Sequence, residues 1–283
     1  MKFKNSYSMR RIQKLAANRL AVVGFSVLVL MMLVCIAAPV LTPYDPSALN
    51  PADKFLPMSA EHLLGTDQLG RDLLARILYG GRVSIFLGLS AALLTNLLGV
   101  ALGCISGYYG GKVDAVLLYI GEVLSCFPGT ILILLVISFL GQSIGWLITV
   151  WTFTGWVGTM RMVRSRMFSL KEEPYIDSCR VNGVSSWSIM FRHLLPNTVG
   201  VITVNITMNI AGYVLAEAGL SYLGFGVPAS IPTWGNMMNA AKNISVMINN
   251  PNLWIIPGAA ISLFVLACNF FGDGLRDVLD VTQ

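Results

Sequence analysis

Long runs without a charged residue alternate with shorter polar segments along the chain. Residues 20–41 are uncharged over 22 positions, and residues 83–105 over 23. At about 1.5 Å of rise per residue, a helix of that length crosses a hydrocarbon core of roughly 30 Å. The uncharged runs at 197–216 and 253–271 are similar. Because lipid offers the backbone no hydrogen-bond partners, each run predicts a transmembrane helix.

The uncharged stretch from 123 to 160 is too long for one helix. Gly141-Gln142-Ser143 divides it naturally, so we expect one span at 115–140 and another at 144–160. Pro128 is expected to kink the first of these two helices. The predicted fold class is therefore an all-α membrane protein with six transmembrane helices.

The composition agrees with a membrane protein. Hydrophobic residues make up 55% of the chain and charged residues 12%, with a mean hydropathy of +0.70. Soluble domains carry about 25% charged residues. The cysteines lie mostly in apolar runs and are interpreted as packing residues, and His62 and His193 fall in separate compartments. No metal site, catalytic residue or cofactor is predicted in this chain.

The distribution of Lys and Arg predicts the orientation. With the N-terminus in the cytoplasm, 14 of the 19 basic residues fall in cytoplasmic segments, as the positive-inside rule requires. Six spans then bring both termini to the cytoplasm. Residues 1–19 form a cytoplasmic segment before an uncleaved first span, because Pro39 directly follows the candidate cleavage site. The charges flank apolar runs and form no single face, so no nucleic-acid partner is predicted.

Three polar segments remain between the predicted spans. Residues 42–82 form an external segment that follows the first helix at 20–41. Residues 161–196 form a long cytoplasmic loop, and residues 217–252 form an external loop that is still rather apolar. The part from 83 to 283 is thus interpreted as a five-helix core that carries the cytoplasmic loop.

The cytoplasmic loop has the pattern of two short helices joined by a sharp turn. Ser169 followed by Glu172 is a capping-box pattern for the first helix, and Gly183 is a natural helix stop. Ser185 or Ser186 can cap the second helix, and Pro196 is expected to open the fifth span. A rigid pair of short helices suits a contact through which a moving partner pushes on the adjoining spans. We expect its apolar side chains to fill a groove on a moving partner: Trp187, Ile189 and Met190.

This loop resembles the Glu-Ala-Ala…Gly…Leu-Pro signature of permease subunits in bacterial binding-protein-dependent, ATP-driven (ABC) importers. The triplet corresponds to Asp177-Ser178-Cys179, which departs from the consensus in all three letters. Gly183 follows six residues after the acid, and His193 stands where the family usually has an aliphatic residue. The resemblance implies an ATPase-coupling loop made of Asp177, Ser178, Cys179, Arg180, Gly183, Val184, Ser185, Ser186, Trp187, Met190, Leu195 and Pro196.

Further stretches resemble the C-type permease of dipeptide, oligopeptide and nickel importers. They lie in order along nearly the whole chain, at 64–72, 76–84, 219–227, 232–236 and 272–280. The resemblance implies the permease fold of type I ABC importers and a multi-pass place in the bacterial cytoplasmic (inner) membrane.

The resemblance also implies a division of labour. This chain would be half of a pathway for ATP-driven uptake of di- or oligopeptides, with nickel or a metal–chelator complex as the alternative cargo. Its partners would be a homologous second permease, two ATPase subunits and an extracytoplasmic substrate-binding protein. ATP and Mg²⁺ would bind the ATPase subunits, because residues 110–113 lack the spacing and hydroxyl of a phosphate loop. The chain itself would be no enzyme.

A secondary transporter is the distant alternative. Such a protein would need internal repeats or ion-coupling charges at mid-membrane, and the sequence has neither. Asn205 and Asn209 lie on one face of the fifth span, where they either line the translocation path or bond a neighbouring helix. Glu122 is interpreted as the one acid well inside a span, close enough to the cytoplasmic end to reach water.

Glycines recur every four residues in the second predicted span, at Gly99, Gly103 and Gly107. A stripe of small residues lets another helix approach closely. Packing within this subunit is the preferred interpretation, and contact with the second permease is the alternative.

Overall fold

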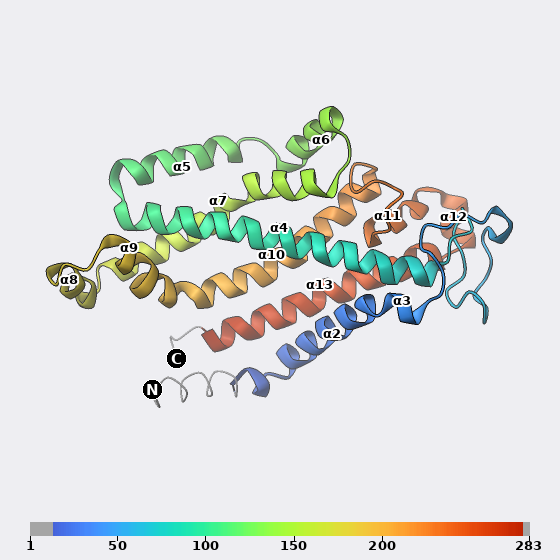
Figure 1. The fold of residues 1–283 in the computed structure, drawn as a ribbon, viewed down its shortest axis with the longest axis horizontal. Coiled ribbons are helices and arrows are strands. Elements are labelled where there is room, and N and C mark those ends of the chain that lie inside the picture. Colours follow the sequence, from blue (N-terminus) through green and yellow to red (C-terminus); the bar gives the residue numbers. More distant parts are fainter. Residues whose placement is uncertain (1–13, 280–283) are drawn as a thin grey trace.

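The computed structural model describes residues 14–279, so most of the predicted N-terminal segment and Asp280 lie outside the described residues. Within that range the chain is helical, with one isolated bridge between Thr66 and Asp72 and no strand. The long helices run lengthwise through the molecule (Figure 1). Short helices gather at its two ends, α8 (Pro174–Val181) and α9 (Ser186–Ser188) at one, α3 (Ala38–Leu41), α11 (Trp234–Met238) and α12 (Ile244–Asn249) at the other.

The long helices carry the apolar runs of the sequence. Those long and apolar enough to cross a membrane are α2 (Arg19–Ile36), α4 (Leu73–Tyr109), the continuous helix Ser186–Leu223 and α13 (Asn252–Leu279). The bent pair α5 (Gly111–Ser125) and α6 (Gly129–Leu140) adds a fifth when it is counted as one span. The remaining long helix, α7 (Ile144–Lys171), is less apolar because its second half carries several basic residues.

Helix α4 begins well before the predicted span at 83–105, because its first turns are stabilised locally. The Asp72 carboxylate caps the helix by accepting a hydrogen bond from the Ala75 N–H at 2.7 Å. Arg76, whose charge argued against a span here, lies 3.6 Å from the carboxylate of Asp67. The helix therefore starts inside the predicted external segment.

The first predicted span is interrupted near its end. Helix α2 stops at Ile36, and α3 follows with Pro39 in its first turn. Proline lacks a backbone N–H and disfavours helical backbone in the residue before it, so an uncharged run need not be one helix. Arg82 of α4 holds this corner by donating hydrogen bonds to the carbonyl oxygens of Cys35, at 2.6 Å, and Ile36.

The predicted third span is not one kinked helix. Helices α5 and α6 meet at an angle of 72°, and the break falls at Pro128, which precedes the first residue of α6. Pro128 was expected to bend this helix, and the structure places a full break at that position. Helices α5 and α6 each have fewer residues than a membrane-crossing helix needs, so neither crosses a membrane by itself.

The cytoplasmic loop is shorter than the predicted range 161–196. Helix α7 runs on to Lys171 because Val163 and Met167 keep an apolar face buried against the bundle. Ser169 therefore lies inside α7, and the capping-box prediction for a helix start there is wrong. The first short helix, α8, instead begins at Pro174, a favoured first-turn residue.

The second short helix is continuous with the fifth span. Helix α9 passes through a π-helical turn (Ile189–Leu194) into α10 (Leu195–Leu223), giving one helix of 38 residues. The Leu195 N–H bonds the Met190 carbonyl, the wider spacing of a π-turn. Pro196 sits in the first turn of α10, as predicted, but it does not separate two helices.

The predicted external loop at 217–252 is largely folded. Helix α10 extends to Leu223 and ends at Gly224, which adopts the left-handed conformation with φ +94°. The chain then returns through α11, a 3₁₀ turn and α12 to α13. Trp234 of α11 is 1% exposed and packs edge-on against Phe264 of α13. This segment is a cap on the bundle.

The glycine stripe packs within this subunit, which confirms the preferred interpretation. A Cβ atom on Gly99 would lie 2.6 Å from the Cβ of Thr159, and one on Gly103 would lie 2.8 Å from the carbonyl oxygen of Met160. Gly107 faces Met167 in the same way. Helix α4 therefore meets α7 at a distance that only glycine allows along this line.

Replacing Gly103 with Ala should destabilise the helix pair. The added methyl group would overlap backbone of α7, and overpacking of this kind costs about 1–3 kcal/mol. Gly158, a helical glycine of α7 with open space beside it, supplies the matched control, and Gly158→Ala should leave stability unchanged or slightly raised. Thermal unfolding in detergent measures both variants, and equal melting temperatures would contradict the packing argument.

Candidate functional site

The turn of the cytoplasmic loop is built around Gly183. This residue has φ +71°, and a Cβ atom there would meet nothing within 4 Å, so backbone conformation rather than space requires glycine. The Val184 N–H bonds the Cys179 carbonyl at 3.0 Å and closes the end of α8. Ser185 caps α9 by accepting from the Ser188 N–H. The predicted helix stop and the predicted cap at Ser185 are both confirmed.

The side chains of the second short helix divide into two faces. Trp187 is 59% exposed and stacks on Phe191, with ring centroids 5.2 Å apart. Ile189 and Met190 are buried, at 1% and 0% exposure. Ile189 packs in a cluster with Ile176 and other residues of α7 and α8. The expectation that Ile189 and Met190 fill a partner's groove is therefore wrong, because they hold the loop to its own bundle.

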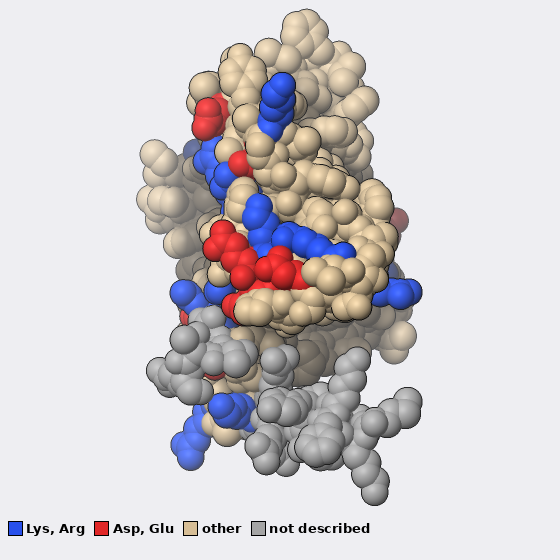
Figure 2. Space-filling view, turned by 90° about the vertical axis from the view of Figure 1, so that its left-hand side faces the viewer, with Lys and Arg blue, Asp and Glu red and all other residues tan. Residues whose placement is uncertain are grey.

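The rest of the loop presents a small mixed surface. Asp177 pairs with Arg180 at 2.9 Å, and both are exposed. Val181 beside them is 88% exposed. Cys179 is half-buried, while Leu195 packs against the buried cluster. The space-filling view of this end of the molecule shows Lys and Arg side chains lying among Asp and Glu side chains (Figure 2).

Two hydroxyl contacts tie the loop to the long helices. Tyr108, near the end of α4, donates to Ser186 at 3.2 Å, and Asn197 of α10 donates to the Tyr175 hydroxyl at 3.4 Å. Burial raises the pKa of the Tyr175 phenol above its ordinary value, so the hydroxyl stays neutral. These two contacts join the loop to α4 and α10.

A partly buried ion pair fixes the same end of the bundle. Both oxygens of Asp114, in the first turn of α5, accept hydrogen bonds from the guanidinium of Arg164 on α7. Ser106 of α4 donates to the same carboxylate at 2.5 Å. Such bidentate pairs are the strongest of their kind. The sequence analysis missed this pair, although an acid at a helix start and a base one span later was the available signal.

Asn205 joins three helices. Its side-chain amide donates to Asn96 of α4 at 2.8 Å and to Thr159 of α7 at 2.9 Å. It also borders a cavity of about 230 Å³ whose lining includes Arg166 and Arg276. Asn209, one turn further on, is half-buried, and its side chain makes no hydrogen bond within residues 14–279. The interpretation that these asparagines bond a neighbouring helix therefore fits Asn205. It does not account for Asn209, which is available for another role.

Glu217, which the sequence analysis placed in an external loop, is a fully buried acid of α10. Glu217 is 0% exposed and accepts hydrogen bonds from Ser221 at 2.6 Å, Thr233 at 2.8 Å and Ser84 at 3.3 Å. These hydroxyls come from α10, the cap and α4. Glu122, which we expected to be the one acid inside a span, is exposed. The hydroxyl one turn after Glu217 was the signal that could have found this cluster.

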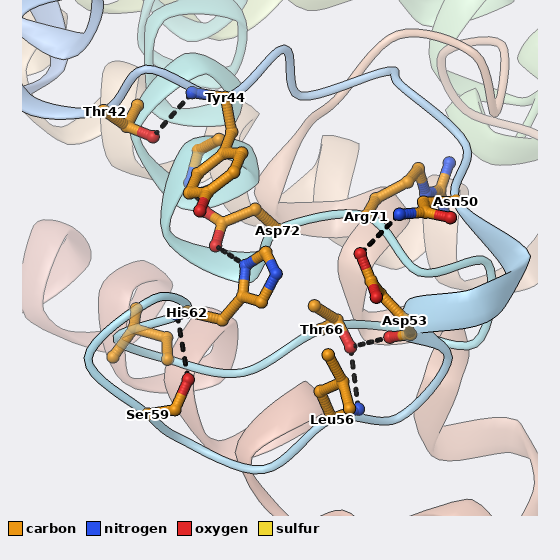
Figure 3. Close-up of polar contacts among 12 residues, drawn as sticks. Thr42, Tyr44, Asn50, Asp53, Leu56, Ser59, His62, Thr66, Arg71 and Asp72 are labelled. Atoms are coloured by element: carbon orange, nitrogen blue, oxygen red, sulfur yellow. Dashed lines mark hydrogen bonds and ion pairs between the residues drawn. The ribbon is translucent and has the colours of Figure 1, made fainter.

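A cluster of polar contacts holds the predicted external segment against the start of α4 (Figure 3). His62 Nδ1 lies 2.9 Å from Asp72 Oδ2, and the ring of Tyr44 packs on His62 with centroids 4.9 Å apart. Thr66 accepts from the Leu56 N–H at 2.8 Å. Two of these residues, Thr66 and Asp72, lie in the stretch 64–72 that carries the resemblance.

Comparison with known proteins identifies the class. Residues 99–281 match the family described as the inner membrane component of binding-protein-dependent transport systems. Residues 6–57 match the N-terminal transmembrane domain of oligopeptide transport permease C. The chain therefore belongs to this family of transport permeases.

Relatives of this chain show which members of the family it resembles. The chain is 37% identical over 264 residues to the oligopeptide transport system permease protein OppC of Bacillus subtilis, covering 93% of this chain and 86% of the relative. It is 36% identical over 277 residues to the dipeptide permease DppC of the same organism, with 97% and 86% covered. It is 39% identical over 257 residues to the glutathione permease GsiD of Pectobacterium atrosepticum, with 89% and 84% covered. The predicted C-type resemblance is confirmed.

Replacing the buried Glu217 should lower stability more than replacing an exposed glutamate. Glu217→Leu leaves three hydroxyls without their acceptor and should lower stability by about 3 kcal/mol. Glu217→Gln keeps one acceptor oxygen and should lose roughly 1 kcal/mol. The exposed Glu122→Leu is the control, with a change within about 0.5 kcal/mol. Thermal unfolding in detergent orders the three variants, and a Glu217→Leu protein as stable as wild type would refute the assignment.

Proposed function

We propose that this chain is the C-type permease subunit of an ATP-driven peptide importer, with six spans and both termini in the cytoplasm. The count is supported by the four apolar long helices, the bent pair α5–α6 and α7. The basic half of α7 and the loop after it belong on the cytoplasmic side by the positive-inside rule. The protein then lies as a multi-pass subunit in the bacterial cytoplasmic membrane.

The continuity of the helix from Ser186 to Leu223 carries this proposal. Its first two turns expose Trp187 and Phe191, while Ile189 and Met190 anchor these turns to the bundle. A partner that grips the exposed aromatic pair moves the whole helix, because a helix transmits a push along its axis. The π-turn before Pro196 is the place where this helix can bend.

The energy would come from other chains. Two ATPase subunits would dock on the cytoplasmic loops of this permease and of a homologous second permease, and would bind ATP and Mg²⁺. An extracytoplasmic binding protein would deliver the cargo. Closure of the ATPases on ATP would then switch the helices between inward-open and outward-open arrangements.

Di- or oligopeptides are the proposed cargo. Support comes from three relatives, which are permeases of oligopeptide, dipeptide and glutathione transport systems. Import of nickel or of a metal–chelator complex by the same machine is the alternative. A secondary transporter is disfavoured, because the described acid inside the bundle, Glu217, is fully engaged with hydroxyl donors.

Truncating the aromatic pair should uncouple ATP hydrolysis from uptake. In the Trp187→Ala/Phe191→Ala protein we expect peptide uptake to fall at least about tenfold, since aromatic anchors at interface centres carry 2 kcal/mol or more, roughly. Co-purification of the ATPase subunits should fall with it. Trp146→Ala, which removes an exposed tryptophan at the other end of α7, is the control. Normal uptake and normal co-purification of the ATPase subunits with the double variant would contradict a coupling role for Trp187 and Phe191.

The two asparagines of α10 should behave differently. Asn205→Leu breaks the contacts to Asn96 and Thr159 and should lower melting temperature in detergent. Asn209→Leu breaks no hydrogen bond of the described chain, so it should keep wild-type stability and lower uptake if Asn209 lines the path. Uptake by the reconstituted importer and thermal unfolding separate the two effects. Unchanged uptake in the double Leu variant would remove both residues from the path.

A further inference from the structure

The outer end of the molecule contains a cavity of about 470 Å³ that the coupling mechanism does not use. Its walls come from the external segment, the first turns of α4 and the cap after Gly224. The charged residues of its lining are Arg71 and Arg76, and no acidic residue borders it. Gln68 adds a side-chain amide, while the amide nitrogen of Asn236 already donates to the carbonyl oxygens of Val227, Pro228 and Ile231. The cavity therefore presents positive charge and hydrogen-bond donors.

The two guanidinium groups share one carboxylate. Asp67 Oδ2 lies 2.7 Å from Arg71 Nε and 3.6 Å from Arg76 Nε. The nearby Asp72 is already engaged by His62 and by the Ala75 N–H. Asp72 keeps its charge but contacts His62 and not the arginines, so the ion pairs of the described residues set two guanidinium groups against the one carboxylate of Asp67.

This excess charge is largely shielded from water. The side chains of Arg76, Asp67 and Arg71 are 3%, 11% and 12% exposed. A cation removed from water is costly unless an anion compensates it. A further anion at the cavity would therefore be bound favourably.

Donor groups remain for such an anion. Arg71 uses its Nε for Asp67, and within the described residues its two Nη atoms have no hydrogen-bond partner. The side-chain amide of Gln68 is likewise without one. Arg76 gives one Nη to the Pro46 carbonyl. A planar fork of this kind matches a carboxylate in geometry as well as charge.

We propose that this cavity is a socket for one Asp or Glu side chain of the extracytoplasmic binding protein. The proposal rests on the proposed function, which puts this end of the molecule outside the cell. Exposed loop residues form much of the rim, among them Ser47, Leu49 and Ser230. A delivery protein lands on such loops, and the socket would fix its register on the permease by charge complementarity.

The test measures the affinity of the binding protein for the complete importer in nanodiscs. Arg71→Gln removes the free fork, and Gln68→Glu places a competing carboxylate at the cavity without touching the Asp67 pair. Each should weaken docking at least about tenfold, the size expected for a buried charge pair. Lys54→Gln, an exposed external cation outside the cavity, is the charge-matched control and should change docking less than about twofold.

A charge scan of the binding protein identifies the occupant. Each surface Asp is changed to Asn and each Glu to Gln, and docking is measured against wild type and Arg71→Gln. We expect one acidic position of the binding protein whose change weakens docking to the wild-type importer. The same change should not weaken docking further when the importer carries Arg71→Gln. Absence of any such coupled position would overturn the socket. So would Arg71-dependent binding of free peptide to the importer without its delivery protein, since cargo would then be the occupant.

The outcomes separate this inference from the proposed function. A wild-type importer that docks its binding protein and imports peptide, with Arg71→Gln and Gln68→Glu unchanged, contradicts the socket alone. A wild-type chain that assembles with no binding protein or ATPase contradicts the proposed function. If the Gln68→Glu protein has the melting temperature of the wild type, its weaker docking is not caused by a loss of the fold.

Discussion

The close approach of α4 to α7 is the constraint on which the rest of the bundle depends. Gly99 and Gly103 let the two backbones touch, and the contact brings Thr159 within hydrogen-bond reach of Asn96. In lipid no hydrophobic effect holds helices together, so close packing and internal hydrogen bonds must do so. The third member of the cluster, Asn205, then fixes α10 against this pair.

Helix α10 connects both ends of the molecule to that pair. At its cytoplasmic end it continues into the turn that carries Trp187, and near its other end Glu217 bonds the cap and α4. These attachments lie on one continuous helix that is interrupted by the π-turn at Ile189–Leu194. The same element therefore contacts the loop at one end of the molecule and the cap at the other.

The polar residues show how this chain keeps charges in an apolar setting. Asp114 and Arg164 neutralise each other, and Glu217 is surrounded by hydroxyls. The described buried side-chain nitrogen and oxygen atoms all have hydrogen-bond partners. Against that background Arg71 and Arg76 differ from the other buried charges, since both lie against the single carboxylate of Asp67.

The sequence by itself determined the membrane class, the approximate positions of the long helices, the turn at Gly183 and the family. These features follow from local chemistry: hydropathy, backbone conformation and motif spacing. Only the tertiary structure decided that α5 and α6 break apart and that Ile189 and Met190 face inward. Only it showed that Glu217 is buried among three hydroxyls. Pro128 marked the position of the break but not its size. The burial of Ile189, Met190 and Glu217 depends on contacts between residues distant in sequence, and a hydropathy pattern carries no information about which helix lies beside which.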